Sequence, residues 1–133
     1  MPGAAEAGNK MIANAGMIKM VGKDRSRMSR LTAECQKGSS SCTVDIGLDW
    51  VAGDELGFAP TASQNLHYEV AVISSYNSST GALTLTAPLK FYHFGAAAST
   101  AANYQGIDMR GEVVLLTRNI VIEGDQTQNN WYG

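Results

Sequence analysis

The chain has 133 residues, which favours a single domain with room for one hydrophobic core. Its 10 basic and 12 acidic side chains give a formal charge of −2, which argues against nucleic acid as a partner. No apolar stretch approaches the roughly 20 residues of a membrane-spanning helix, and the first residues lack the pattern of a secretory signal peptide. Two settings stay open: a cytosolic protein, or a piece of a longer secreted chain.

Residues 1–15 are rich in alanine and glycine and weakly patterned, so we expect a flexible or loosely ordered segment there. From Gly16 onward, short apolar runs alternate with clusters of Gly, Ser, Thr and Asn, which is typical of turn-rich β structure. We therefore expect residues 16–133 to form one β segment. The expected strands, in chain order, are 17–21, 28–33, 41–44, 55–59, 68–74, 82–86, 113–116 and 120–122.

Two cysteines flank the loop QKGSSS. Cys35 and Cys42 can form a cross-strand disulfide if their Cα atoms lie within about 7 Å, as is common in secreted chains. The alternative is two unpaired thiols at a loop. No histidine lies nearby in the sequence, so the pair does not predict a zinc site.

A tight turn is expected at residues 51–54, directly after Trp50. We expect Trp50 to pack over this turn rather than bind a ligand. Gly53 belongs to the turn, and Asp54 is expected to cap it with its own side chain. Glu55 would face the opposite side of the following strand, so Asp54 and Glu55 make a poor catalytic pair.

The clearest local unit is a hairpin formed by the strands 68–74 and 82–86. Val70 and Val72 share one face of the first strand. The turn SYNSSTG between the strands contains an N-glycosylation sequon at Asn77, which suits an exposed position in a secreted protein.

No stretch shows helical periodicity over more than about ten residues, so the predicted fold class is all-β. The polar corner 117–119, between the apolar runs 113–116 and 120–122, favours a solenoid whose stacked coils share one core. Closely spaced short strands also fit a sandwich or a barrel, and the pattern alone does not separate these architectures.

Three segments match, in the same order, the motifs of one family of large cell-surface proteins. They are WVAGDEL with the following APT in 50–61, APLKFYHFG in 87–95, and DMRGEVVLLTRNIVIEG in 108–124. The chain resembles the family of fibrocystin-L, fibrocystin, the cell-surface hyaluronidase and the cell-migration-inducing hyaluronan-binding protein. Residues 16–31 are similar to the end of the eight-glycine domain of that family, although Met28-Ser29 replace its usual Trp-Thr.

The resemblance implies a right-handed parallel β-helix of the pectin-lyase-like type, with β-hairpin excursions. It also implies an extracellular or cell-surface protein much longer than this chain, which would then be a fragment of a longer solenoid or an unusually short relative. The open coil ends and unpaired edges of a solenoid would join other copies of the chain or further coils of the same protein, and these are the partners that we expect.

Five residues are candidates for contact with an extracellular glycan. Arg110, Glu112 and Arg118 flank the last apolar runs and could bind an anionic glycan by charge-assisted hydrogen bonds; the alternative is an ion-pair ladder between coils. Tyr92 could stack on a sugar ring. His93 could act as a general acid or base, and the alternative is a buried histidine bonded to a backbone carbonyl.

We therefore expect a non-catalytic structural segment of an extracellular cell-surface, coat or filament protein, which self-associates or is part of a longer chain. The alternative is a module that binds or depolymerises a hyaluronan-like glycan. The sequence contains no arrangement typical of a nucleophilic triad, a phosphate-binding loop or a metal cluster. We predict no catalytic residues, no metal and no cofactor.

Overall fold

The structure is a computed structural model, and it describes residues 12, 14–63, 65–98, 103–104 and 106–122. The chain divides into two compact units: Asp24–Thr117, and a second unit that combines Met1–Lys23 with Arg118–Gly133. Most of the segment 1–15, which we expect to be loosely ordered, lies outside the described residues.

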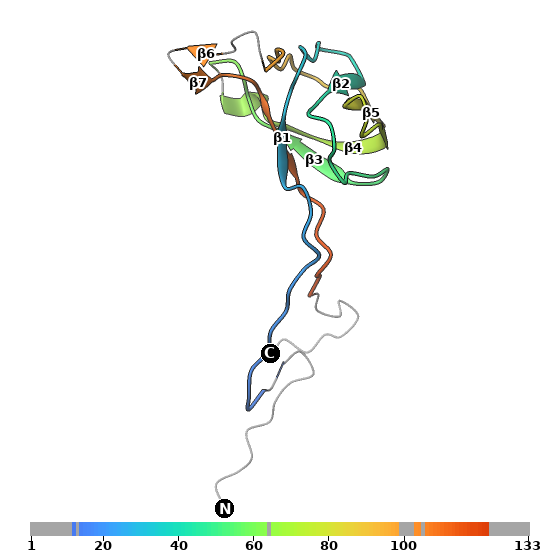
Figure 1. The fold of residues 1–133 in the computed structure, drawn as a ribbon, viewed down its shortest axis with the longest axis vertical. Coiled ribbons are helices and arrows are strands. Elements are labelled where there is room, and N and C mark those ends of the chain that lie inside the picture. The colour runs from blue at the N-terminus through green and yellow to red at the C-terminus, as the bar shows by residue number, and fades with distance from the viewer. Residues whose placement is uncertain (1–11, 13, 64, 99–102, 105, 123–133) are drawn as a thin grey trace, which may run out of the picture. The chain divides into compact units, whose positions relative to one another are not determined.

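The unit Asp24–Thr117 is built on a six-stranded antiparallel sheet (Figure 1). Its strands are β1 (Met28–Arg30), β2 (Ser41–Thr43), β3 (Glu55–Phe58), β4 (Glu69–Tyr76), β5 (Ala82–Leu85) and β8 (Glu112–Leu115). Their order in the sheet is β1-β8-β3-β4-β5-β2. A short 3-10 helix, η1 (Asn65–His67), precedes β4, and β6 (Asn103–Tyr104) pairs with β7 (Ile107–Asp108) in a separate two-stranded sheet.

The sheet curls because β4 pairs with two neighbours in turn. Its first half pairs with β3 and its second half with β5, and the register shifts between Ile73 and Ser75. Such an irregularity bends a strand and increases its twist. As a result the two edge strands approach each other, and one bridge joins Leu31 to Val44, just beyond β1 and β2. The sheet is a curled antiparallel half-barrel.

The all-β fold class is confirmed, but the described residues do not form the right-handed parallel β-helix that the resemblance implies. Every strand pairing among them is antiparallel. Only residues 77–81 connect β4 to β5, whereas a parallel pair needs a crossover of roughly a dozen residues or more. The strand β8 enters between β1 and β3 and runs opposite to both.

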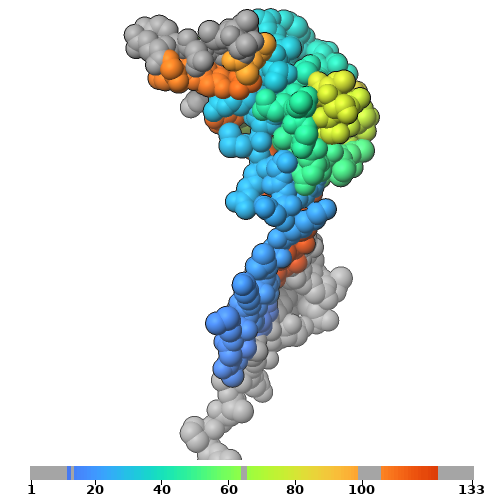
Figure 2. Space-filling view, in the orientation of Figure 1, coloured from blue at the N-terminus to red at the C-terminus, as the bar shows by residue number. Residues whose placement is uncertain are grey.

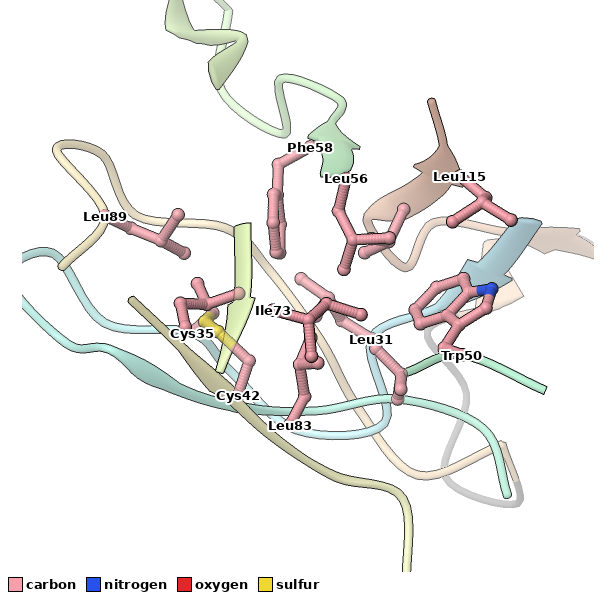
Figure 3. Close-up of a cluster of buried hydrophobic side chains, with 13 residues drawn as sticks. Leu31, Cys35, Cys42, Trp50, Leu56, Phe58, Ile73, Leu83, Leu89 and Leu115 are labelled. Atoms are coloured by element: carbon pink, nitrogen blue, oxygen red, sulfur yellow. A yellow bond between two sulfur atoms is a disulfide. The ribbon is translucent and has the colours of Figure 1, made fainter. Parts of the chain in front are cut away.

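One core fills the concave side of the half-barrel (Figure 3). Leu56 and Phe58 of β3 are buried, and in β5 Leu83 and Leu85 alternate with exposed residues, as period-two strands require. Leu89 and Cys35 lie at one end of this cluster in Figure 3, and Trp50 and Leu115 lie at the other.

The shared face of Val70 and Val72 is the outer face of β4, where the two side chains are 50% and 37% exposed. Ile73 is buried in the core instead, and Ala71 packs against the core. The hairpin was expected from the sequence, but the face of β4 that meets the core follows from the curl of the whole sheet.

The described part of the second unit consists of two extended segments, 14–23 and 118–122. They lie side by side, since a Cβ atom on Gly22 would come within 2.7 Å of the Asn119 side-chain oxygen (Figure 1). Neither segment is assigned as a strand, although strands were expected at 17–21 and 120–122. Large apolar side chains are exposed in both segments: Met17, Ile18, Met20, Val21, Ile120, Val121 and Ile122.

No helix within the described ranges is both long enough and apolar enough to cross a membrane.

Candidate functional site

The turn after Trp50 encloses a buried ion pair. Gly53 adopts φ +90°, a left-handed conformation that favours glycine, and the Val51 N–H donates to the Asp54 carboxylate at 2.9 Å. Arg25, 29 residues upstream, donates to both carboxylate oxygens of Asp54 at 2.8 and 2.7 Å. These bonds from Arg25 hold the pKa of Asp54 below its usual range, although burial acts in the opposite direction.

Neighbouring residues fix Arg25 and Trp50 in place. The Arg25 guanidinium also contacts the Asp49 carboxylate at 3.3 Å, and the Trp50 indole N–H donates to the Ser26 carbonyl oxygen at 2.7 Å. The Ser26 N–H donates to Asp49 and is the largest cause of the lowered pKa of that carboxyl. Glu55 is exposed and is held here through its backbone: its N–H donates to Thr117 Oγ1, and its carbonyl oxygen accepts the Leu116 N–H. The motif around Trp50 therefore has a structural role, through packing and charge pairing.

Arg110 and Glu112 belong to a second cluster of charges. Arg110 donates from Nε and Nη2 to the Asp108 carboxylate at 3.0 and 2.8 Å, which holds the pKa of Asp108 at about 2. Arg30 donates to Glu112 Oε1 at 2.7 Å and to the Arg110 carbonyl oxygen at 3.1 Å. Arg30 thus joins the two candidates. Arg118 belongs to the other unit, so the structure does not define a row of all three.

One polar atom of this cluster has no hydrogen-bond partner among the described residues. This atom is Arg110 Nη1, which is buried, and the carboxylate oxygen Asp45 Oδ1 lies 3.7 Å from it. The Asp45 carboxylate is already engaged, because its other oxygen accepts from the Ser29 hydroxyl and the Arg30 N–H, both at 3.0 Å. This arrangement ties the edge strand β1 to the residues that follow β2.

His93 lies in the segment 88–95, which we call the strap. Its side chain is fully buried, with Nδ1 2.9 Å from the Ala59 carbonyl oxygen and Nε2 2.9 Å from Glu69 Oε1. The backbone N–H groups of Lys90 and Phe91 donate to the same carboxylate at 2.7 and 3.0 Å. Burial opposes the ionisation of Glu69, but these donors and His93 outweigh it and keep the pKa of Glu69 below its usual range.

Tyr92 is the candidate in the strap that retains an exposed surface, at 37%. Burial of the rest of the ring and the nearby Glu34 carboxylate raise the pKa of the Tyr92 hydroxyl. On another part of the strap, the Phe91 ring stacks on the His67 ring with centroids 4.2 Å apart. Tyr92 could still meet a ligand from solvent, whereas His93 could not without a movement of the strap.

The structure joins Cys35 and Cys42 in a disulfide, with Cα atoms 5.2 Å apart and both residues buried. Cys35 also exchanges two backbone hydrogen bonds with His93, each 2.9 Å long. Asn77 is exposed in the turn between β4 and β5, and its Oδ1 accepts the Ser79 N–H at 3.0 Å. The space-filling view shows the segment around this turn at the surface (Figure 2).

Sequence reasoning missed Arg25, Arg30 and the pairing of Glu69 with His93. The available signal was indirect: an aspartate buried beside a tryptophan turn needs a cation, and the nearest charged loop contains Arg25. Within the described residues no group of three His, Cys, Asp or Glu side chains could hold a metal ion.

The half-barrel and its clusters define a compact β module in which buried charged groups bond to one another. Comparison with known proteins shows what this module is similar to. The chain is 34% identical over 98 residues to mouse fibrocystin-L, which covers 72% of the chain and 2% of that protein. Two G8 domain-containing proteins of Dictyostelium discoideum are 27% and 26% identical over 120 and 123 residues, which cover 87% and 90% of the chain.

These alignments take in 10% and 8% of the two Dictyostelium proteins, so the chain spans a small part of each curated relative. No family model matches the chain. The similarities support a protein of the G8-domain type. They do not show the narrower relationship that the resemblance led us to expect, to the cell-surface hyaluronidase or to the hyaluronan-binding protein.

Proposed function

We propose that the chain is a non-catalytic structural module of an extracellular, G8-domain-type protein. The proposal rests on the observation that the charged side chains of the module bond to one another. Arg25 is bonded to Asp54, Arg110 to Asp108, and His93 to Glu69. A glycan-binding or catalytic site needs polar groups that converge on a ligand, whereas these groups converge on one another.

A titration of the purified chain with hyaluronan and related anionic glycans, together with a turnover assay, tests this proposal. We expect no saturable binding and no depolymerisation. Arg110→Ala should lower the thermal midpoint, because Asp108 then loses its ion pair with Arg110 and keeps the longer one with Arg30, at 3.5 Å. Saturable binding that is lost in both Tyr92→Ala and Glu112→Ala would establish the glycan-binding alternative instead.

The second unit supplies the contact by which we expect the module to assemble. Met17 and Val21 are 89% and 73% exposed, and Val121 and Ile122 are 65% and 67% exposed. Exposed apolar side chains at this density are typical of an interaction surface. Their partner is a second copy of the chain or a further part of the same protein.

Light scattering of the isolated chain measures this assembly. We expect concentration-dependent oligomers that dissociate in the double variant Met17→Ser, Val121→Ser. The matched control is Val70→Ser, which removes an exposed apolar side chain from the outer face of β4. A monomer at all concentrations would contradict self-association, and would leave only contact with the rest of a longer chain.

An extracellular setting is supported by the disulfide and by the exposed sequon at Asn77. We propose that Asn77 carries an N-linked glycan in a secretory cell. A secreted form of the chain should lose mass on treatment with an amidase specific for N-glycans. Ser79→Ala should abolish the modification, because the hydroxyl two residues after asparagine belongs to the sequon. Ser78→Ala should leave it intact, and equal masses in all forms would refute glycosylation at Asn77.

A further inference from the structure

His93 places both nitrogens of its imidazole against hydrogen-bond acceptors. Nδ1 faces the Ala59 carbonyl oxygen, which can only accept, so Nδ1 carries a hydrogen. Nε2 faces Glu69 Oε1 at 2.9 Å, and a contact of this kind needs a proton between its two atoms. A neutral imidazole has one N–H. The folded pair therefore binds one proton more than a neutral imidazole and a separate carboxylate would hold.

The surroundings of Glu69 place that proton on the imidazole. Its carboxylate accepts the backbone N–H groups of Lys90 and Phe91 at 2.7 and 3.0 Å, and such donors favour the ionised form of a carboxyl group. His93 is thus an imidazolium paired with a carboxylate. The two side chains are 0% and 10% exposed, so solvent screens their interaction weakly.

This pair stands where the strap meets three other parts of the half-barrel. The imidazolium contacts Ala59, the residue that follows β3, and Glu69 at the start of β4. The His93 backbone is bonded to Cys35. On one side, Leu89 exchanges backbone bonds with Gly38 and Ser39. On the other, a Cβ atom on Gly95 would collide with the Ala33 carbonyl oxygen.

The other ionisable groups on the elements around His93 are occupied elsewhere. Tyr92 interacts with Glu34, and Lys90 is exposed and reaches the pair through its backbone N–H. Cys35 does not titrate, because it is in the disulfide. Among the described residues, Glu69 is the charged group in direct contact with the imidazole.

We propose that His93 and Glu69 form a proton-dependent latch. The latch fixes the strap 88–95 across one end of the core while the pair holds its proton, and releases the strap when the proton is lost. Loss of the proton leaves the imidazole lone pair facing a buried carboxylate, which costs the hydrogen bond and the ion pair together.

The direction of the pH effect follows from proton counting. An unfolded histidine gives up its proton near about pH 6.5. Above that pH the folded state holds one proton more than the unfolded state, so each further pH unit raises the unfolding equilibrium constant about tenfold. The stabilisation is complete between about pH 4.5 and pH 6.5, where the Glu69 carboxylate is ionised and the pair holds its proton. It is lost as the pH rises through the point at which the folded pair releases its proton.

Nitrogen NMR of the imidazoles in the unmodified chain reads the latch directly and needs no variant. The chain contains two histidines. We expect both ring nitrogens of His93 to carry hydrogens at pH 7.5. Amide hydrogen exchange should then show faster opening of the Phe91 and His93 amides at pH 9 than at pH 7, after correction for intrinsic rates, with little change in β3.

The matched variants are His93→Phe and His67→Phe. His93→Phe should abolish the tenfold-per-unit slope of the unfolding constant between pH 7 and 8.5, and His67→Phe should retain it. A neutral His93 ring in the folded chain at pH 7.5 would overturn the proposal. An unchanged slope in His93→Phe would overturn it as well.

Discussion

The two buried ion pairs of the half-barrel differ in one respect, the chemistry of the cation. Asp54 and Glu69 each lie almost out of contact with solvent, and each accepts backbone N–H bonds in addition to a side-chain partner. The partner of Asp54 is Arg25, which stays charged at every accessible pH. The partner of Glu69 is His93, which loses its charge near neutrality when unfolded. The same fold thus contains a permanent pair and a titratable pair.

The largest expected effect comes from breaking the permanent pair. Asp54→Ala removes the acceptor of two Arg25 bonds and of the Val51 N–H, and should lower the free energy of unfolding by about 3–5 kcal/mol. Urea unfolding measures this loss. The control Asp24→Ala breaks the exposed pair with Arg27 and should change stability by less than about 0.5 kcal/mol. Equal effects of the two variants would mean that the buried Arg25–Asp54 pair stabilises the fold no more than an exposed pair does.

The next effect concerns the disulfide beside the titratable pair. Replacing Cys35 and Cys42 with serine should lower the free energy of unfolding by about 2–3 kcal/mol, because the loop that the disulfide closes is short. Thermal unfolding with and without reductant checks this. The serine variant should show the same midpoint in both conditions, and an unmodified chain indifferent to reductant would contradict the prediction.

Acid should weaken both pairs together. Asp54, Glu69 and Asp108 have lowered pKa values in the folded chain, that of Asp108 being about 2. Their contribution to stability is therefore complete above about pH 4.5, the upper end of the unfolded range for carboxyl groups. It is lost as the pH falls through the pKa of each carboxyl in the folded chain, which is about 2 for Asp108. The thermal midpoint should fall progressively across this window. A midpoint independent of pH between 5 and 2 would show that these carboxylates are not stabilised by the fold.

The smallest effect is expected at the half-exposed pair of Arg30 and Glu112. Glu112→Ala should cost less than about 1 kcal/mol, because solvent screens the pair and Arg30 keeps its bonds to the carbonyl oxygens of Asp108 and Arg110. Chemical denaturation measures this loss, and the effect should shrink further in high salt. A loss as large as that of Asp54→Ala would place Glu112 among the buried pairs.

Most strands of the half-barrel could be predicted from the sequence, because alternation is a local property. The expected strand 55–59 corresponds to β3 and the expected strand 82–86 to β5, each within a residue or two. The pairing of strands could not be predicted in the same way. β8 lies between β1 and β3, more than fifty residues away from either along the chain, and no local pattern identifies such a neighbour. The resemblance implied a β-helix, whereas the described strands curl into a half-barrel.

The contacts of the polar clusters divide in the same way: those between residues close in the sequence could be predicted, and those between distant residues could not. The bond of Asp54 to its own turn could be anticipated from the sequence, because it spans three residues. Its bonds to Arg25 could not, since they span 29 residues. For His93 the sequence allowed two interpretations, a histidine bonded to a backbone carbonyl and a general acid or base. The structure has the carbonyl bond, and adds Glu69, 24 residues upstream, as the partner of the second nitrogen.

The unit Asp24–Thr117 is entered and left through neighbouring strands, because β1 and β8 are paired antiparallel and the Leu115 N–H donates to the Arg27 carbonyl oxygen. A module with adjacent ends can be inserted into a loop of a host protein without separating the two sides of that loop. The same geometry has a mechanical consequence. Tension applied to the two ends would load the hydrogen bonds between β1 and β8 one after another, as in a zipper, so this seam would part before the rest of the half-barrel.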